Sequence, residues 1–260
     1  MSESFKSLCN DSYVNMKLTL KMDLPKSRET VLDTFERLRK AYPEMGQFRR
    51  YKDEYALESP QSDLPHRWAA MRSNYLRAGT VNAATLPEAY ALHHTLLTLA
   101  PSYLSISPLD VDYIELLYGF DLVAGGNHDA IVLSALLANS PLSALMDIPG
   151  ATPIDFQPML GMAMPRRGDT EVFFEVKTHH AATRAEGDNG PGAGITVEGI
   201  TQGDPISVYV TLRKFGPILE VEELPRLFTA LCQKGEDLVQ HRVIPGLLLP
   251  IREAISSGNA

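Results

Sequence analysis

Strict alternation of apolar and polar side chains marks four segments of the chain: residues 14–22, 114–122, 154–164 and 206–212. Successive side chains of a strand point to opposite faces, so alternation predicts strands with one buried and one solvated face. Residues 172–176 repeat the pattern over a shorter length. Sheets with one wet face are typically antiparallel. We therefore expect antiparallel sheets that helices cover on one side.

Apolar residues at helical spacing predict five helices between and after these strands. Ser27 is a capping residue, and Thr85 with Glu88 forms a capping box. Pro245 and Gly246 interrupt the last apolar pattern, which predicts a kink or a break there. The expected helices cover residues 27–41, 85–99, 127–138, 224–231 and 238–255.

The order of elements predicts an α+β fold. Residues 47–57 and 67–78 alternate less cleanly and are each expected to form one strand. Residues 13–124 then read strand, helix, strand, strand, helix, strand, which is the ferredoxin-like βαββαβ order. Residues 125–260 are expected to form a related second half of antiparallel strands with C-terminal helices, either separate or joined to the first half in one continuous sheet. Residues 1–12 are polar and are expected to be a disordered tail.

Composition restricts the possible partners and the location. The chain carries 24 Lys and Arg against 32 Asp and Glu, a net charge of −8, whereas nucleic-acid binding usually requires a basic stripe. No apolar stretch approaches the roughly 18 residues of a membrane helix, and the first residues do not form a secretory signal. The two cysteines, Cys9 and Cys232, form neither a disulfide framework nor a zinc site. We expect a cytoplasmic protein that binds no nucleic acid, no membrane and no cofactor.

Asn127, His128 and Asp129 are the candidate metal ligands, because they follow Gly125 and Gly126 between an expected strand and an expected helix. This Gly-Asn-His-Asp run resembles one metal-binding segment of the calcineurin-like metallophosphoesterases. The resemblance covers five residues and implies a metal-activated water and hydrolysis. The chain contains no Asp-x-His, which that family also uses. The alternative is that the glycines form a turn and that Asn127 caps the helix.

A polar cluster on the outward face of the second-half strands is the other candidate site. A carboxylate, an imidazole and a phenol could carry out acid–base chemistry, and a lysine, an arginine and an unexpectedly placed phenylalanine could bind an anion or a partner. The same residue types are typical of any solvated strand face. The catalytic candidates are Glu175, His179 and Tyr209, and the binding candidates are Lys177, Arg213 and Phe173.

The remaining motifs lack the context that their chemistry requires. Adjacent histidines at 93–94 and 179–180 point in different directions in a helix or a strand, so neither pair can share one metal ion. The glycine-rich residues 190–194 lack the lysine and hydroxyl residue of a phosphate-binding loop and precede an expected strand. They are expected to form a flexible loop, with a lid over a site as the alternative.

Three hypotheses for function follow. The first is a non-catalytic binding or interaction protein, which self-associates through a sheet edge or through the apolar residues 243–255. The second is a metal-dependent hydrolase that uses Asn127, His128 and Asp129. The third is a small-molecule binding domain with a pocket between helices and sheet near Tyr118 and His179. No nucleophile motif is present, which favours the first hypothesis over an enzyme.

Overall fold

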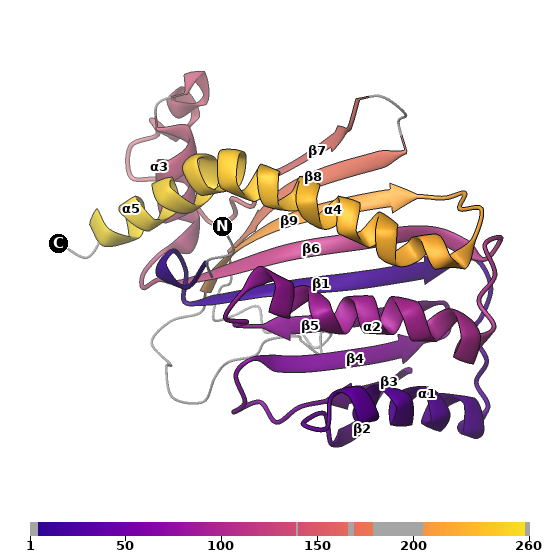
Figure 1. The fold of residues 1–260 in the computed structure, drawn as a ribbon. Coiled ribbons are helices and arrows are strands. Elements are labelled where there is room, and N and C mark those ends of the chain that lie inside the picture. The colour runs from indigo at the N-terminus through magenta and orange to yellow at the C-terminus, as the bar shows by residue number, and fades with distance from the viewer. Residues whose placement is uncertain (1–4, 139, 166–168, 179–204, 258–260) are drawn as a thin grey trace.

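The alternating segments form one antiparallel sheet. The computed structural model describes residues 5–138, 140–165, 169–178 and 205–257. Within these residues, nine strands pair in the order β2-β3-β4-β5-β1-β6-β9-β8-β7 (Figure 1). The strands are β1 (Asp11–Leu20), β2 (Gln47–Tyr51), β3 (Glu54–Glu58), β4 (His66–Arg72), β5 (Tyr75–Val81), β6 (Val111–Val123), β7 (Met159–Ala163), β8 (Thr170–Lys177) and β9 (Pro205–Phe215).

Helices α1, α2, α4 and α5 lie on one face of this sheet, and α3 packs against α5 (Figure 1). None of the helices in the described part of the chain combines the length and the apolar character needed to cross a membrane. The α-helices are α1 (Arg28–Ala41), α2 (Leu86–Leu104), α3 (His128–Leu137), α4 (Leu224–Leu238) and α5 (Leu249–Ser257), with 3-10 turns at Phe5–Ser7, Pro141–Met146 and Val221–Glu223 and a π-helical segment at Val239–Leu248.

The main core lies between the helices and the sheet. Met16, Leu116 and Leu212 are neighbours across three central strands and face the helices. Leu92 of α2 and Phe228 of α4 cover them, and all five side chains are at most 1% exposed. The expected alternation is therefore present in the central strands, whose other side chains point to the opposite face.

The two halves of the chain follow the same order of elements. β1 is followed by α1, by successive antiparallel strands that end in β5, and by α2. β6 is followed by α3, by strands that end in β9, and by α4. β5 pairs with β1, β9 pairs with β6, and β1 pairs with β6 at the centre of the sheet. The arrangement is thus similar on the two sides of the β1–β6 pair.

Four strands separate α1 from α2, where the sequence analysis expected two. β2 and β3 pair up to Tyr51↔Glu54, and β4 and β5 pair up to Arg72↔Tyr75, so each expected strand is a hairpin with a two-residue loop. The loops are Lys52-Asp53 and Ser73-Asn74. Neither contains the glycine that usually marks such a turn, which is why the sequence pattern did not reveal them.

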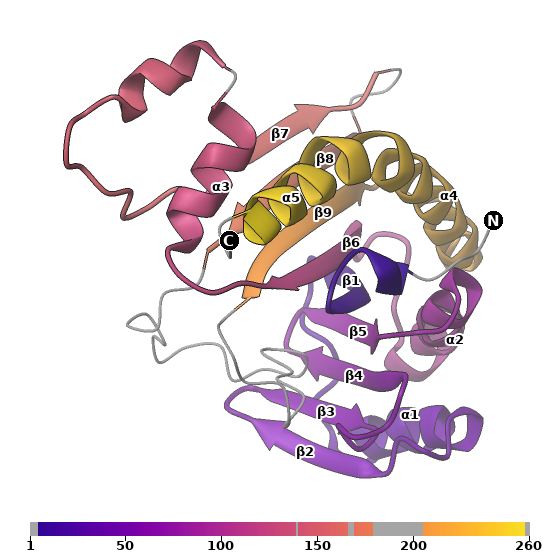
Figure 2. The same ribbon diagram turned by 90° about the vertical axis from the view of Figure 1, so that its left-hand side faces the viewer.

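Two segments differ from the expectation: one was expected to be part of a disordered tail, and the other a kinked or broken helix. Residues 5–12 lie in the segment expected to be a disordered tail, yet Phe5 packs edge-on against Phe120 with ring centroids 5.2 Å apart, and β1 begins at Asp11. Pro245 lies inside the π-helical segment, so α4, this segment and α5 form one helical run that curves over the sheet without a break (Figure 2). The wider π winding accommodates the missing N–H of proline.

Candidate functional site

Among the described strands, β7 is the outermost on one side of the sheet, and all five of its residues are exposed. Its sequence, Met-Leu-Gly-Met-Ala, contains no charged residue and no proline. Natural edge strands are usually protected by charge, by proline, by a bulge or by a covering segment. The opposite edge, β2, carries Arg49 and Arg50. By comparison, β7 has no protecting charge within its own sequence.

Alternate residues of β7 direct both their backbone N–H and C=O groups away from the partner strand β8. Two backbone hydrogen bonds to β8 flank the strand: Met164 N donates to Thr170 O (2.8 Å), and Val176 N donates to Pro158 O (3.0 Å). Hydrogen-bonded pairs alternate along an antiparallel ladder, so even-numbered residues of this segment bond to β8. The N–H and C=O groups of Met159, Gly161 and Ala163 therefore point toward the free edge.

Apolar side chains are concentrated next to this edge. The segment between α3 and β7 stands away from the body of the molecule (Figure 2). Together, this segment and β7 contain seven of the thirteen large hydrophobic side chains that are exposed among the described residues. We call these seven the edge patch: Leu142, Leu145, Ile148, Ile154, Met159, Leu160 and Met162.

The edge patch corrects an expectation from the sequence. Alternation over residues 154–164 predicted one strand with a buried apolar face. The observed strand spans only Met159–Ala163, Ile154 is 83% exposed in the preceding loop, and Leu160 is 56% exposed on the helix side of the sheet. The alternating side chains of β7 do point to two different faces of the sheet. However, β7 lies beyond the described helices, so its apolar face is not covered by them.

Three of the polar residues proposed from the sequence do lie together on the sheet face opposite the helices. Glu175 of β8 is the direct neighbour of Tyr209 of β9. Lys177 Nζ lies 3.5 Å from Glu175 Oε1 and 5.6 Å from the centre of the Tyr209 ring. His179 lies outside the described residues, as do His180 and residues 190–194. A lysine, a carboxylate and a phenol are thus assembled, whereas the imidazole of the proposed set is not placed.

The other two candidates, Arg213 of β9 and Phe173 of β8, contact each other further along the same two strands. The Arg213 guanidinium lies 5.4 Å from the Phe173 ring centre and 4.7 Å from that of Tyr113. Its Nε and Nη2 both donate to Glu115 Oε2, at 3.0 and 2.8 Å. Phe173 is therefore half-buried under an arginine, and Arg213 already has a carboxylate partner. Their arrangement is that of a stacked, ion-paired sheet surface.

Asp121 is a partly buried carboxyl on this face that is not among the candidates from the sequence. Its Oδ1 accepts hydrogen bonds from Ser207 Oγ (2.7 Å) and from Tyr13 OH (3.4 Å). Burial raises its pKa from 3.8 to about 6, and the charge of Asp11 adds to the increase against the opposing hydrogen bonds. The sequence signal for this site is Gly119, a glycine inside a strand. The Tyr13 ring, whose hydroxyl reaches Asp121, lies against Gly119, and a Cβ at this position would be 2.1 Å from Tyr13 Cε2.

The proposed metal segment holds the local backbone together. Asn127 caps α3, its Oδ1 accepting from Ala130 N (3.0 Å), and its Nδ2 donates to Pro153 O (2.8 Å). His128 Nε2 lies 3.0 Å from Ala124 O. Among the described residues, no group of three His, Cys, Asp or Glu side chains could hold a metal ion.

Asp129, the third residue of the metal proposal, is fully buried and connects two distant segments. Its Oδ1 accepts from Phe156 N (2.9 Å) and from Thr178 Oγ1 (2.6 Å). Through these bonds it fixes the loop before β7 and the end of β8 to the start of α3. The carboxylate therefore stabilises the base of the segment that carries the edge patch.

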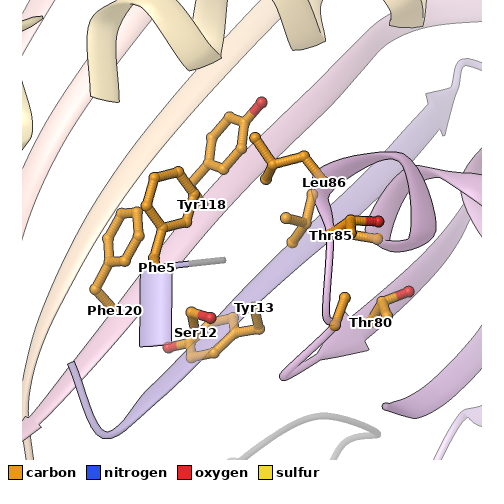
Figure 3. Close-up of a pocket in the computed structure, with 11 residues that line it drawn as sticks. Phe5, Ser12, Tyr13, Thr80, Thr85, Leu86, Tyr118 and Phe120 are labelled. Atoms are coloured by element: carbon orange, nitrogen blue, oxygen red, sulfur yellow. The ribbon is translucent and has the colours of Figure 1, made fainter. Parts of the chain in front are cut away.

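The cavity beside Tyr118 is small. It lies between the 3-10 turn at Phe5–Ser7, the start of α2 and the ends of three strands, and the rings of Phe5, Tyr118 and Phe120 gather around it (Figure 3). Its volume of about 20 Å³ is that of one water molecule. Tyr118 itself is fully buried and hydrogen-bonded to Tyr90 OH (2.7 Å).

The C-terminal apolar residues are also covered within the chain. Val243, Leu248 and Ile251 are at most 1% exposed, because the curved helical run presses them against the sheet and neighbouring helices. From the sequence, residues 243–255 are a candidate partner surface. Most of their apolar character is used in the core, and the edge patch is the larger exposed apolar surface among the described residues.

No family model matches this chain. No curated protein matches it either.

Proposed function

We propose that the protein is a non-catalytic interaction protein that binds a second copy of itself through β7. The observation that carries the proposal is the exposed, uncharged strand whose outward N–H and C=O groups belong to Met159, Gly161 and Ala163. Such an edge is a template for pairing with another strand, which would extend the sheet across the interface.

An antiparallel pair centred on Gly161 satisfies the backbone of both copies. In this register Gly161 faces Gly161 of the second copy, and Met159 faces Ala163 of the second copy. These are the residues whose peptide groups point outward, so they become the hydrogen-bonded pairs. The helix-covered faces of both copies then lie on the same side of the joined sheet. A twofold axis through Gly161 closes the assembly as a dimer.

Side chains support the same register. Leu160 of one copy faces Met162 of the other in the non-hydrogen-bonded pairs, where side chains are closest. Both residues are on the helix side, beside Phe174 and Val172 of β8. Full burial of a Leu or Met side chain contributes about 1.5–3 kcal/mol, and the dimer contains two such pairs. The exposed leucines and isoleucines between α3 and β7 provide further apolar area.

Charge substitutions test both the pairing and its register. The variant Leu160→Lys/Met162→Lys places lysine opposite lysine twice across the axis, and the dimer should dissociate. The variant Leu160→Glu/Met162→Lys places glutamate opposite lysine twice, and dimerisation should return. The control is Met22→Lys, because Met22 is an exposed methionine (68%), as Met162 is (44%), and lies in the loop after β1.

Light scattering coupled to size exclusion gives the mass of each variant. We expect the wild type, the Met22→Lys variant and the Glu/Lys variant to have the mass of two chains, and the Lys/Lys variant that of one. A wild type that is monomeric at every concentration overturns the proposal. A Lys/Lys variant that remains dimeric places the interface elsewhere and also overturns it.

We also propose that the fold is a duplicated, elaborated ferredoxin-like arrangement. It is supported by the repeated order of strand, helix, returning strands and helix, with each half's returning strand beside its first strand. In the first half, β1, β4, β5 and β6 have the neighbours of a ferredoxin-like sheet, with the β2–β3 hairpin added. Superposition of β1-α1-β5-α2 on β6-α3-β9-α4 tests this proposal. A crossover of opposite hand in the second half would contradict it.

The cytoplasm is the location we propose. Two free cysteines support it, Cys232 buried and Cys9 partly so, because thiols persist in reducing compartments. Cell fractionation with an antibody to the protein would test this, and recovery from an oxidising compartment or the medium would contradict it.

A further inference from the structure

A cleft of about 380 Å³ opens at the far side of the sheet from β7. It lies between the loop that leads into α1 and the turns of the β2–β3 and β4–β5 hairpins. Its volume is within the range of sites for small organic ligands. Its lining comes from these three segments and from Val31 of α1.

The floor of the cleft is apolar. Leu24, Val31 and Met71 are each at most 5% exposed, and the half-buried Tyr55 contributes an aromatic ring. These side chains belong to three different segments that the α1 packing brings together. An apolar floor favours a ligand with an aliphatic or aromatic body over a bare inorganic ion.

The rim of the cleft is cationic, although the chain as a whole carries a net charge of −8. Four exposed cations line it, Lys26, Arg50, Lys52 and Arg72, against the single carboxylate of Asp53. Clustered charges of one sign around a concave surface attract ligands of the opposite sign.

Two of these cations already have carboxylate partners, and a third contacts an aromatic ring. Arg72 Nη2 lies 3.4 Å from Asp53 Oδ2, and Lys26 Nζ lies 2.8 Å from Asp23 Oδ2. The Arg50 guanidinium lies 5.7 Å from the centre of the Tyr55 ring, within cation–π distance. A guanidinium that contacts a ring loses less freedom when it binds an anion, and its fork fits two phosphate oxygens.

We propose that this cleft binds a small organic phosphate, with the phosphate at Arg50 and Lys52 and the apolar body over Leu24, Val31 and Met71. The site is separate from β7 and does not depend on dimerisation.

Isothermal titration calorimetry of the full chain with 1-naphthyl phosphate tests the proposal. Inorganic phosphate probes the cationic part of the cleft alone, and 1-naphthol probes the apolar part alone. The test variant is Arg50→Gln/Lys52→Gln. The control is Arg39→Gln/Lys40→Gln, which removes the same two charges from the exposed last turn of α1, outside the cleft. Thermal unfolding of each variant reports whether the fold is retained.

We expect 1-naphthyl phosphate to bind the wild type at least about tenfold more tightly than either partial probe. The Arg50/Lys52 variant should lose at least about tenfold in affinity, because hydrogen bonds to charged groups are the stronger ones, and the Arg39/Lys40 variant should not. Absence of binding, equal binding of 1-naphthol, or equal losses in both double variants would overturn the proposal. If the test variant does not fold, loss of 1-naphthyl phosphate affinity at high salt replaces it, and salt-independent binding overturns the proposal.

Discussion

Asp121→Asn removes a partly buried charge while preserving its hydrogen bonds. The asparagine carbonyl oxygen can accept from Ser207 and Tyr13 as Oδ1 of the carboxylate does. The side chain keeps its size, so the packing under the sheet surface is retained. What changes is titration, because asparagine behaves as a carboxyl group that is never ionised. The substitution therefore isolates the effect of this one charge on stability.

The structure gives the sign and the size of that effect. Burial raises the pKa of Asp121 from 3.8 to about 6 in the folded protein. Below the lower value both folded and unfolded chains are protonated, and the effect is absent. Between about 4 and about 6 the folded state holds its proton more tightly, so the free energy of unfolding falls as pH rises. The full loss, reached above the folded pKa, is about 3 kcal/mol at about 1.4 kcal/mol per pKa unit.

Urea unfolding of the wild type and the variant across this pH range measures the difference directly. We expect near-equal stability at the acid end and an Asp121→Asn variant that is more stable by up to about 3 kcal/mol above the folded pKa. Asp33→Asn, at an exposed position of α1, is the control and should show little difference at either end. A stability difference between wild type and Asp121→Asn that does not change with pH would refute the reasoning.

Three further substitutions test the packing of the helices and the anchoring of the edge patch. Gly235→Ala would place a Cβ 2.4 Å from Tyr118 Cε2, and we expect it to lower the free energy of unfolding by about 1–3 kcal/mol. Gly246→Ala meets no atom within 4 Å and should raise it by up to about 1 kcal/mol, so equal effects in urea unfolding would contradict the described packing of α4. Asp129→Ala removes the acceptor for Phe156 N and Thr178 Oγ1 and should cost about 3 kcal/mol or more. It should also speed proteolysis between α3 and β7, and unchanged cleavage there would be evidence against the anchoring role.

The sequence was sufficient for the central strands and for the starts of α1 and α2. Alternation at residues 14–22 and 114–122 placed β1 and β6 correctly, and the caps Ser27 and Thr85 mark the starts of α1 and α2. These elements are specified by residues close in the chain. The hairpin loop at Lys52-Asp53 was missed because it lacks the glycine that usually follows aspartate in a two-residue turn.

Features that depend on distant contacts could not be predicted in the same way. Alternation showed that Leu160 lies on the apolar face of its strand. It did not show that the described helices leave this face uncovered. The burial of Asp121 depends on the neighbouring strands that place Tyr13 and Ser207 beside it. Asn127 illustrates the opposite case, because its local role as a helix cap was one of the two alternatives that the sequence offered.

Amide hydrogen exchange of the wild type, resolved by residue in β7, tests the proposed pairing most directly. The inward amides of Leu160 and Met162 bond to β8, whereas those of Met159, Gly161 and Ala163 point to the free edge of one chain. If a second copy pairs there, the outward amides should be protected to a similar degree as the inward ones, and the Lys/Lys variant should lose only the outward protection. Outward amides that exchange freely in the wild type, beside protected inward ones, would contradict the account.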